Sequence, residues 1–196
     1  MSSFYDCVVL AAGTSTRMGQ WKMLLPWHGS TVLETTLDTA RTVCRRIILV
    51  AGYREQELRA ALGEMDNTVI ATNSAFERGM FSSIQTGLAR VETEFAFITL
   101  GDMPLIPAEI YRKLAFETQT AGNQPPPDVL RPVCGERPGH PVLLSRTAMD
   151  RVAAAARDSD MRTVLAGFHT LFVPARDERP CIDLDSSEQY RRYLEQ

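Results

Sequence analysis

The residues with the clearest capacity for chemistry lie in a glycine-rich segment, residues 10–22, with the sequence LAAGTSTRMGQWK. The segment follows an apolar run that predicts a buried strand, and in an open α/β sheet ligands bind at the carboxyl ends of such strands. Gly13 and Gly19 let main-chain N–H groups approach an anion, while Arg17 and Lys22 add two positive charges. This combination suits a triphosphate.

The spacing within this segment excludes two common phosphate-binding motifs. A P-loop has four residues between its glycines and a lysine directly after the second, whereas five residues separate Gly13 from Gly19 and Lys22 comes later. The dinucleotide fingerprint needs a third glycine spaced to open a helix, and the segment has none. A solvated glycine-rich turn, with Arg17 and Lys22 binding nothing, is the alternative that these residues alone leave open.

Carboxylates form a second group of candidates. Asp102 ends the apolar run 95–102, so it is expected at the same sheet edge, where a carboxylate beside a triphosphate needs an intervening cation such as Mg²⁺. A plain Gly-Asp turn is the alternative. Asp183 and Asp185 are two residues apart, so on an extended segment their side chains face the same way. A helix-capping role for Asp185 is the alternative.

The histidines and cysteines indicate neither a zinc site nor a disulfide framework. A lone histidine such as His140, between glycine and proline, is structural or solvated more often than catalytic. The cysteines are widely spaced and form no Cys-x-x-Cys pair. We therefore interpret all four as packing residues: Cys7, Cys44, Cys134 and Cys181.

The elements that must position these residues alternate along the chain. Short apolar, β-branched runs predict buried strands at residues 7–12, 47–52, 68–72, 95–102, 140–145 and 170–174. Helical spacing of apolar residues predicts helices at 31–45, 56–62, 81–91, 107–120 and 145–157, with a last helix capped by Ser186 or Ser187. Residues 122–132, with three consecutive prolines, predict a surface loop. This alternation predicts a three-layer α/β fold with a mostly parallel sheet.

Composition limits the classes of protein. The chain has 196 residues, 44% of them hydrophobic, which suits a single domain over residues 1–196. A net charge of -3 argues against a nucleic-acid partner. Residues 1–5 do not resemble a targeting segment, and the sequence lacks an apolar run of the ~18 residues that cross a bilayer, so we expect a cytoplasmic protein without a membrane partner.

Taken together, the motifs resemble the NTP-transferase domain of the molybdenum cofactor nucleotidyltransferases. The resemblance covers nearly the whole chain and implies a Rossmann-like fold with a nucleotide-binding N-terminal part and an acceptor-binding C-terminal part. It rests on the glycine-rich segment with the LLP that follows it, ILVAGY at 48–53, Asn73 with Gly79 and Ser82-Ser83, GDMP at 101–104, GHP at 139–141, and IDLD at 182–185.

The resemblance also implies roles for individual residues. Arg17 would bind the β and γ phosphates and Lys22 the α-phosphate, and together with Asp102 they would be the catalytic residues. Asp102 would bind Mg²⁺, or Mn²⁺, with Asp183 or Asp185, and His140 would face the acceptor. The family's frequent Thr-Pro after the second acid is Ser186-Ser187 here, which weakens the match locally. The remaining nucleotide-binding residues would be Leu10, Ala11, Ala12, Gly13, Asn73, Gly79, Ser82 and Ser83.

Similarity within the family favours CTP as the nucleotide. LAAG in the first loop resembles the cytidylyl branch, since the guanylyl branch has LAGG, and the Ala12 methyl narrows the space beside the base. The acceptor implied is molybdopterin carrying its metal, with molybdoenzymes or their chaperones as protein partners. Alternatives are GTP as donor, a sugar or small-alcohol phosphate as acceptor, and a non-catalytic molybdenum cofactor carrier. An NAD-dependent dehydrogenase is disfavoured because its fingerprint is missing.

Overall fold

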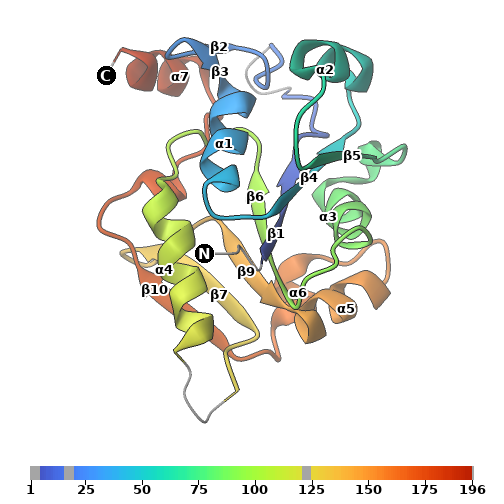
Figure 1. Cartoon of the computed structure of the whole chain (residues 1–196), viewed down its shortest axis with the longest axis vertical. Helices are drawn as coiled ribbons and strands as arrows, with labels where there is room; N and C mark the ends of the chain where they lie inside the picture. The colour runs from blue at the N-terminus through green and yellow to red at the C-terminus, as the bar shows by residue number, and fades with distance from the viewer. Residues whose placement is uncertain (1–4, 16–19, 121–124, 196) are drawn as a thin grey trace.

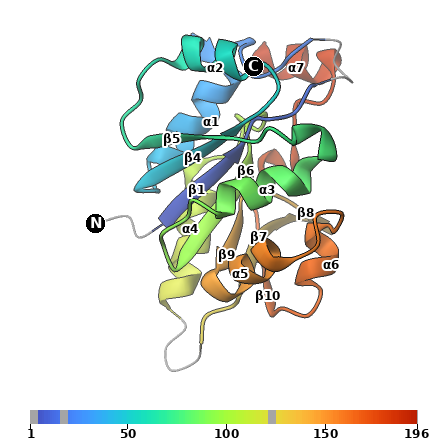
Figure 2. The ribbon, with the colours of Figure 1, turned by 90° about the vertical axis from the view of Figure 1, so that its right-hand side faces the viewer.

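The computed structural model describes residues 5–15, 20–120 and 125–195, and in it a mixed sheet lies between two layers of helices (Figures 1 and 2). The strands are β1 (Tyr5–Leu10), β4 (Arg46–Ala51), β5 (Thr68–Thr72), β6 (Phe95–Leu100), β7 (Val129–Cys134), β8 (Arg137–Pro138), β9 (Val142–Ser145) and β10 (Thr170–Pro174), with β2 (Pro26–Trp27) and β3 (Ser30–Thr31) in a separate ribbon. The helices are α1 (Val32–Arg41), α2 (Glu55–Leu62), α3 (Met80–Leu88), α4 (Ala108–Gln119), α5 (Arg146–Ala154), α6 (Met161–Leu165) and α7 (Ser187–Leu194), with short 3-10 turns η2 (Phe76–Arg78) and η3 (Arg179–Cys181).

The main sheet has the strand order β10-β7-β9-β6-β1-β4-β5, with β8 paired to β7. Strand β1 is parallel to both β4 and β6, β4 is parallel to β5, and β10 is parallel to β7. Strand β9 alone on this path runs antiparallel to its neighbours β6 and β7. The expectation of a mostly parallel α/β sheet is therefore confirmed, and the carboxyl ends of β1, β4, β6 and β7 share one edge.

Both faces of the sheet are covered, which explains why β1 is a continuous buried run rather than an alternating one. On one face the core includes Leu33 and Leu37 of α1 and Leu114 of α4. On the other it includes Ile84 of α3 and Met149 of α5. Figure 2 shows the two helical layers on either side of the strands. Helix α7 packs separately against the β2–β3 ribbon through a small apolar cluster: Trp27, Val32, Leu184, Tyr190, Tyr193 and Leu194.

Two capping boxes fix helices beside the carboxyl edge. The Thr31 side chain accepts from Glu34 N at the start of α1, and the Glu34 carboxylate accepts from Thr31 N. Ser186 makes the same exchange with Gln189 at the start of α7, so of the two predicted caps it is Ser186 that is used. Because Gln189 Oε1 also accepts from Asp185 N at 3.1 Å, this cap orders the acidic segment that precedes the helix.

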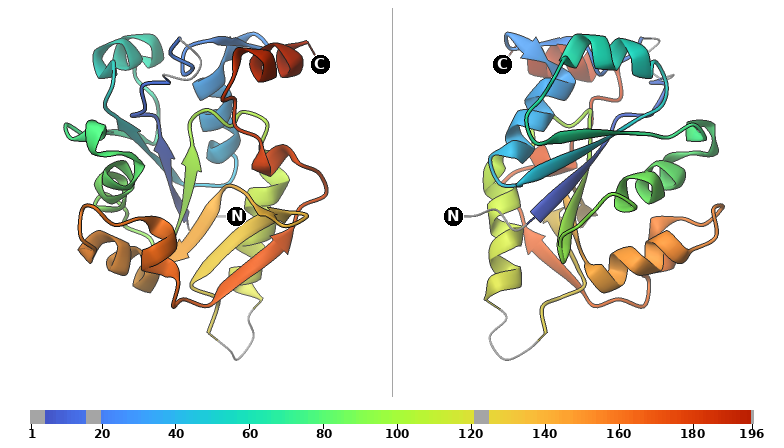
Figure 3. Two further views of the ribbon diagram at one scale, coloured as in Figure 1. Left: turned by 180° about the vertical axis from the view of Figure 1, so that it is seen from behind. Right: turned by 45° about the vertical axis from the view of Figure 1, so that its right-hand side comes forward.

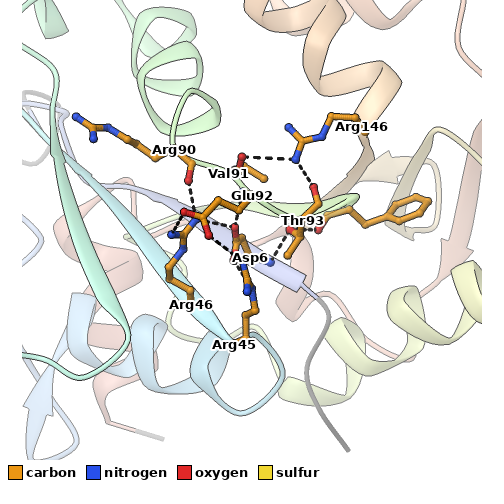
Figure 4. Close-up of polar contacts among 9 residues, drawn as sticks. Asp6, Arg45, Arg46, Arg90, Val91, Glu92, Thr93 and Arg146 are labelled. Carbon is orange, nitrogen blue, oxygen red and sulfur yellow. Dashed lines mark hydrogen bonds and ion pairs between the residues drawn. The ribbon is translucent and has the colours of Figure 1, made fainter.

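A polar network closes the opposite, amino edge of the sheet (Figure 4). Asp6 on β1 is fully buried, and its carboxylate accepts from Arg45 Nε at 3.1 Å, Arg46 Nη2 at 3.0 Å and Glu92 N at 2.9 Å. Its two oxygens are thus satisfied by two cations and one amide, which is how a buried carboxylate is tolerated. The network joins β1, β4 and the loop before β6 at their beginnings, far from their carboxyl ends.

The loop predicted at residues 122–132 is partly wrong, because Val129–Cys134 forms strand β7. Strand β9 pairs with β7 only at Val129 and Leu130. Pro132 lies beyond that pairing, so its missing N–H interrupts no β7–β9 ladder, while its carbonyl accepts from Gly139 N at 2.8 Å. Helix α6 was likewise not predicted, since it is only five residues long and buries none of them.

The interpretation of all four cysteines as packing residues is wrong for two of them. Cys7 and Cys44 are buried and free, as expected, but Cys134 and Cys181 form a disulfide. The bond joins the end of β7 to η3, two segments 47 residues apart, and no local sequence signal marks such a pair. It holds η3 just before the segment that carries Asp183.

Within the described residues, no helix combines the length and apolar character needed to cross a bilayer.

Candidate active site

A cleft of about 690 Å³ opens at the carboxyl edge of the sheet, a volume typical of ligand sites. The ends of β1 and β6, the turn after β4, the start of α3 and the acidic segment before α7 contribute its walls. Its lining residues are Leu10, Ala12, Gly13, Thr14, Ser15, Lys22, Met23, Tyr53, Phe76, Glu77, Gly79, Met80, Ser83, Leu100, Asp102, Asp183 and Asp185. The structure thus brings together most of the residues singled out in the sequence.

Lys22 lies at the centre of the acidic side of the cleft. Its Nζ donates to Asp102 Oδ2 at 2.6 Å and to Asp185 Oδ1 at 2.9 Å. The Lys22 side chain is only 8% exposed, against 14% for Asp102 and 33% for Asp185. Burial alone would lower the pKa of Lys22, but the two carboxylates, Asp102 first, outweigh it and raise the pKa above its ordinary value. Lys22 is therefore a cation at neutral pH.

The ammonium retains one further donor. An –NH₃⁺ group has three N–H bonds, and two of them are used by Asp102 and Asp185 among the described residues. Because Lys22 lines the cleft, the third can donate to an oxygen of a bound phosphate while the carboxylate contacts persist. Lys22 can therefore serve an anionic ligand without first abandoning its ion pairs.

Asp183 lines the same cleft, as the period of two between it and Asp185 predicts. Burial, and then the negative charge of Asp185, raise the pKa of Asp183. The described residues contain no group of three or more histidine, cysteine or acidic side chains close enough to enclose a metal ion. That arrangement still fits Mg²⁺, which is held in phosphate-binding sites by one or two carboxylates, with substrate phosphates and water completing its shell.

The first loop contributes unequally to the cleft. Leu10, Ala12 and Gly13 line it, whereas Ala11 is buried and its N–H donates to Val50 O at 2.9 Å. The Ala11 N–H is therefore not available to a phosphate. The resemblance implied that each residue of the LAAG run at 10–13 binds the nucleotide, and the Ala11 amide does not fit that role. Lys22 N donates to Ser15 Oγ at 3.3 Å, which ties the loop to the lysine. Arg17 lies outside the described residues, as does Gly19.

Asn73 supports the cleft from behind rather than lining it. It is buried, and its Nδ2 lies 2.9 Å from both Ser82 Oγ and Ser83 Oγ at the start of α3. Ser82 Oγ also donates to Gly79 O at 2.8 Å, so this hydroxyl is committed within the protein. Of the predicted group, only Gly79 and Ser83 reach the cleft, and Asn73 with Ser82 fixes the turn that presents them.

An aromatic and apolar wall of the cleft was not singled out from the sequence. Tyr53, Phe76 and Met80 line it, and the rings of Tyr53 and Phe76 lie 6.3 Å apart. Gly52 makes this wall possible, because a Cβ there would lie 2.7 Å from Phe76 Cβ and 3.0 Å from Ala12 Cβ. Tyr53 was recognisable in principle, since it follows the buried run of β4 at the edge where ligands bind.

His140 lies two residues before β9, next to Ile98 of β6, and outside the lining of the cleft. Burial first, and then the positive charge of Arg131, lower the pKa of His140 to about 4, and a bond to the Ile98 carbonyl and the charge of Asp102 oppose this only in part. At neutral pH His140 is thus an uncharged imidazole. Its proposed role toward the acceptor stays a prediction.

A buried lysine bridging two carboxylates below a glycine-rich turn, at the carboxyl edge of a Rossmann-like sheet, is suited to hold the phosphates of a nucleotide beside a divalent ion. The fold and this arrangement place the chain among the nucleotidyltransferases. More narrowly, it belongs to the family described by the MobA-like NTP transferase domain, whose model matches residues 7–175.

Individual relatives support this family. The chain is 34% identical over 197 residues to a molybdenum cofactor cytidylyltransferase of Escherichia coli (strain K12), covering 98% of this chain and 99% of that protein. It resembles the crystal structure of Rv0371c from Mycobacterium tuberculosis H37Rv with a TM-score of 0.80, 30% identity and full coverage of both chains. The manganese complex of the same protein has a TM-score of 0.73 and 29% identity, covering 97% of this chain and 98% of that one.

Proposed function

We propose that this protein transfers CMP from CTP to the terminal phosphate of a molybdenum-bearing molybdopterin, releasing pyrophosphate. The observation that carries the proposal is the Lys22 ammonium, held by Asp102 and Asp185 in a cleft whose other side is the turn after β1. The name of the Escherichia coli relative, a molybdenum cofactor cytidylyltransferase, supports the choice of substrates.

In the proposed reaction an oxygen of the acceptor phosphate attacks the α-phosphorus of CTP. The new P–O bond forms as the bond to the β-phosphate oxygen breaks, and pyrophosphate leaves with the electron pair. Negative charge grows on the α-phosphate oxygens and on the leaving group, so a cation at that position binds the transition state better than the ground state. Lys22 supplies this cation, and Arg17 is proposed to do the same for the β and γ phosphates.

We further propose that Asp102 and Asp185 hold a Mg²⁺ ion, for which Mn²⁺ can substitute. The ion would neutralise the charge of the triphosphate and of the departing pyrophosphate. Without a counter-ion the cleft would repel its substrate, since Asp102, Asp183 and Asp185 all line it. No general base is required, because a phosphate monoester is already an anionic nucleophile at neutral pH. Orientation and charge neutralisation would then provide most of the rate.

Choice of CTP over GTP is proposed to depend on the space next to Ala12. The Ala12 methyl faces Gly52 and the Tyr53–Phe76 wall, which leaves room for the smaller pyrimidine ring. The Ser83 hydroxyl, positioned by Asn73, is available on the same cleft to bond a polar base edge. We also propose a division of residues 1–196 into a nucleotide-binding N-terminal part and an acceptor-binding C-terminal part, acting in the cytoplasm with molybdoenzymes or their chaperones as partners.

The decisive experiment incubates purified protein with Mg²⁺, molybdenum-bearing molybdopterin and either CTP or GTP, and measures pyrophosphate release together with the dinucleotide product. We expect product with CTP and little with GTP. Product from GTP alone would reassign the donor, and transfer to a sugar or small-alcohol phosphate would reassign the acceptor. Binding of the cofactor without pyrophosphate release would indicate a carrier rather than an enzyme.

A further inference from the structure

Arg131, in the middle of β7, is a partly buried cation, and the structure describes no carboxylate partner for it. Among the described residues no aspartate or glutamate makes an ion pair with it, and its Nη2 donates to the Gly139 carbonyl at 3.2 Å. Its Nε is buried and has no acceptor in the part of the chain that the structure describes. Burying a guanidinium in this way is costly, because a buried charge normally requires pairing. An anion that is not part of the protein would satisfy it.

The contrast with the amino edge of the sheet makes this clearer. There, Arg45 and Arg46 both contact the buried Asp6 as well as Glu92. Arg137, on the same hairpin as Arg131, pairs with Glu178. Half-buried or exposed, these arginines have carboxylate partners within the chain, whereas Arg131 has none in the described part of it.

Strand register shows where Arg131 points. Its neighbour Leu130 belongs to the core under α4, so by the alternation of a strand Arg131 is on the opposite face. Its partner across the β7–β10 ladder, Phe172, shares that face and is 50% exposed, which shows that the face is open to solvent there. Figure 3 (left) shows β9, β7 and β10 side by side, with the helix α4 behind them.

The same face leads to the active site. Strand β7 runs in the direction of β6, so its carboxyl end lies at the edge that carries Asp102. His140 responds to both charges, since the positive charge of Arg131 lowers its pKa and the negative charge of Asp102 raises it. Because His140 is neutral at physiological pH, the positive charge that the described residues place next to it is that of Arg131.

The proposed reaction needs such a cation. Its nucleophile is a phosphate anion that must approach a triphosphate bound in a cleft lined by Asp102, Asp183 and Asp185. The Lys22 ammonium is already engaged with Asp102 and Asp185. Without an attractive charge on the acceptor side, the two anionic substrates and the acidic wall repel one another. A guanidinium is also the side chain best shaped to bind a phosphate in bidentate fashion.

We propose that Arg131 binds the anionic phosphate monoester of the acceptor and positions it for attack, with the exposed Phe172 ring beside it offering an apolar surface to the body of that molecule. This inference rests on the proposed function for the identity of the reaction, but the anion site itself is defined by Arg131 alone. Arg131 is accordingly a positioning residue of the acceptor subsite and makes no contribution to nucleotide binding.

The test compares Arg131→Met with Arg137→Gln, a matched control that removes one positive charge from the same hairpin. With CTP saturating, Arg131→Met should raise the KM for molybdenum-bearing molybdopterin at least about tenfold, the loss expected for a hydrogen bond to a charged group. The KM for CTP and the Kd for CTP with Mg²⁺ should stay at the values of the control. Arg131→Lys should recover part of the loss, because it restores the charge but not the fork.

Unfolding temperature separates this role from a structural one. Replacing an unpaired, partly buried charge by a similar-sized apolar chain should leave Tm unchanged or raise it, whereas a structural arginine would lower it. The inference is overturned if the acceptor KM of Arg131→Met lies within about twofold of the Arg137→Gln value. It is also overturned if the KM for CTP rises as much as the KM for the acceptor.

A second measurement does not depend on turnover. Inorganic phosphate is titrated into the protein while an α,β-methylene analogue of CTP with Mg²⁺ fills the nucleotide cleft. Wild type and Arg137→Gln should bind phosphate, and Arg131→Met should bind it at least about tenfold more weakly. Equal binding by all three rejects the anion site even if CMP transfer is demonstrated. Conversely, absence of CMP transfer with intact, Arg131-dependent phosphate binding rejects the proposed function and keeps the site.

Discussion

The Nζ atom of Lys22 lies 2.6 Å from Asp102 Oδ2, which joins the loop after β1 to the carboxyl end of β6 across the floor of the cleft. The pair is shielded, with side-chain exposures of 8% and 14%, so its electrostatic interaction is stronger than that of a surface ion pair. It therefore organises the site before substrate arrives and keeps both charges where the α-phosphate is expected.

We predict that Lys22→Ala and Asp102→Ala each lower turnover at least about a hundredfold, the usual cost of losing one charge-stabilising contact in a transition state. Lys113→Ala, which removes an exposed lysine bound only to a carbonyl, is the control and should retain full activity. Steady-state pyrophosphate release measures the effect. Near-normal rates in either site variant would show that our role assignment is wrong.

The stability of the same pair offers an independent check. Lys22→Met leaves two carboxylates facing each other without a cation and should lower Tm, whereas Lys22→Met combined with Asp102→Asn removes one of these charges and should recover part of the loss. Activity should not recover in the double variant. Equal Tm for the single and double variants would mean that the ion pair does not couple the two segments.

We predict that Asp185, rather than Asp183, is the second metal ligand. Asp185 and Asp102 converge on one point, since both contact the Lys22 ammonium, and Asp183 makes no such contact in the described structure. Loss of outer-shell partners alone weakens metal binding 10–100-fold, so Asp102→Asn and Asp185→Asn should raise the half-saturating Mg²⁺ concentration at least about tenfold. Asp183→Asn should do so less. EDTA should abolish turnover. Mn²⁺ affinity, measured by electron paramagnetic resonance without any turnover, should rank the three variants in the same order.

Nucleotide choice should respond to the space around Ala12. Its Cβ would lie 3.0 Å from a Cβ placed on Gly52, so both residues shape the same pocket wall. We predict that Ala12→Gly loosens preference toward GTP, measured as the ratio of kcat/KM for CTP and GTP in competition. Gly52→Ala, which pushes Phe76 into the cleft, should weaken binding of both nucleotides. An unchanged ratio in Ala12→Gly would remove Ala12 as a selector.

The disulfide between Cys134 and Cys181 should stabilise the acidic side of the cleft. It closes a loop of 47 residues and is reinforced by the His140 N–H, which donates to the Pro180 carbonyl at 2.8 Å. Reduction should lower the free energy of unfolding by about 2–4 kcal/mol, mainly by releasing the unfolded chain. Urea denaturation with and without reductant measures this. The Cys134→Ser, Cys181→Ser double variant should match the reduced protein and should not respond to reductant.

Sequence patterns located the candidate cleft because two of its charged residues follow buried strands. Lys22 and Asp102 come after the runs that form β1 and β6, and parallel neighbouring strands bring their carboxyl ends together. The resemblance to a family added Asp185 and Ser83. Local rules failed where tertiary contacts decide: Pro132 is tolerated in β7 only because β9 has already separated from it, and Cys134 meets Cys181 only after the second half has folded.

Asn73 and Arg131 illustrate the same limit in the site itself. The motif marked Asn73 as nucleotide-binding, but whether an amide faces a ligand or holds two serines cannot be read from a linear pattern. Nothing in the sequence distinguishes Arg131 from the surface arginines. What distinguishes Arg131 is that no carboxylate among its described neighbours pairs with it. This depends on how β7, β9 and the 139–140 segment come together in the fold, which a linear sequence does not show.

The half-buried His140 makes the stability of the protein depend on pH in a defined direction. Its pKa is about 4 in the folded protein, lowered first by burial, against 6.5 for an ordinary histidine. Above pH ~6.5 both the folded and the unfolded chain carry a neutral imidazole, so the residue contributes no pH dependence there. Between pH 6.5 and 4 the unfolded chain binds a proton that the folded chain excludes, so the free energy of unfolding falls as pH falls, by up to about 1.4 kcal/mol per unit.

We therefore predict that His140→Asn flattens the acid side of the stability profile. Urea denaturation of both proteins at intervals from pH 7 to pH 4.5 gives the two slopes, and carboxylate titrations common to both cancel in their difference. The two curves of unfolding free energy against pH should converge toward low pH. The reason is that the variant has no imidazole whose protonation stabilises the unfolded chain there. Parallel curves would mean that His140 is protonated equally in both states. In that case His140 would be charged near pH 6, and it would add a second positive charge next to Arg131, where we propose that the acceptor phosphate binds.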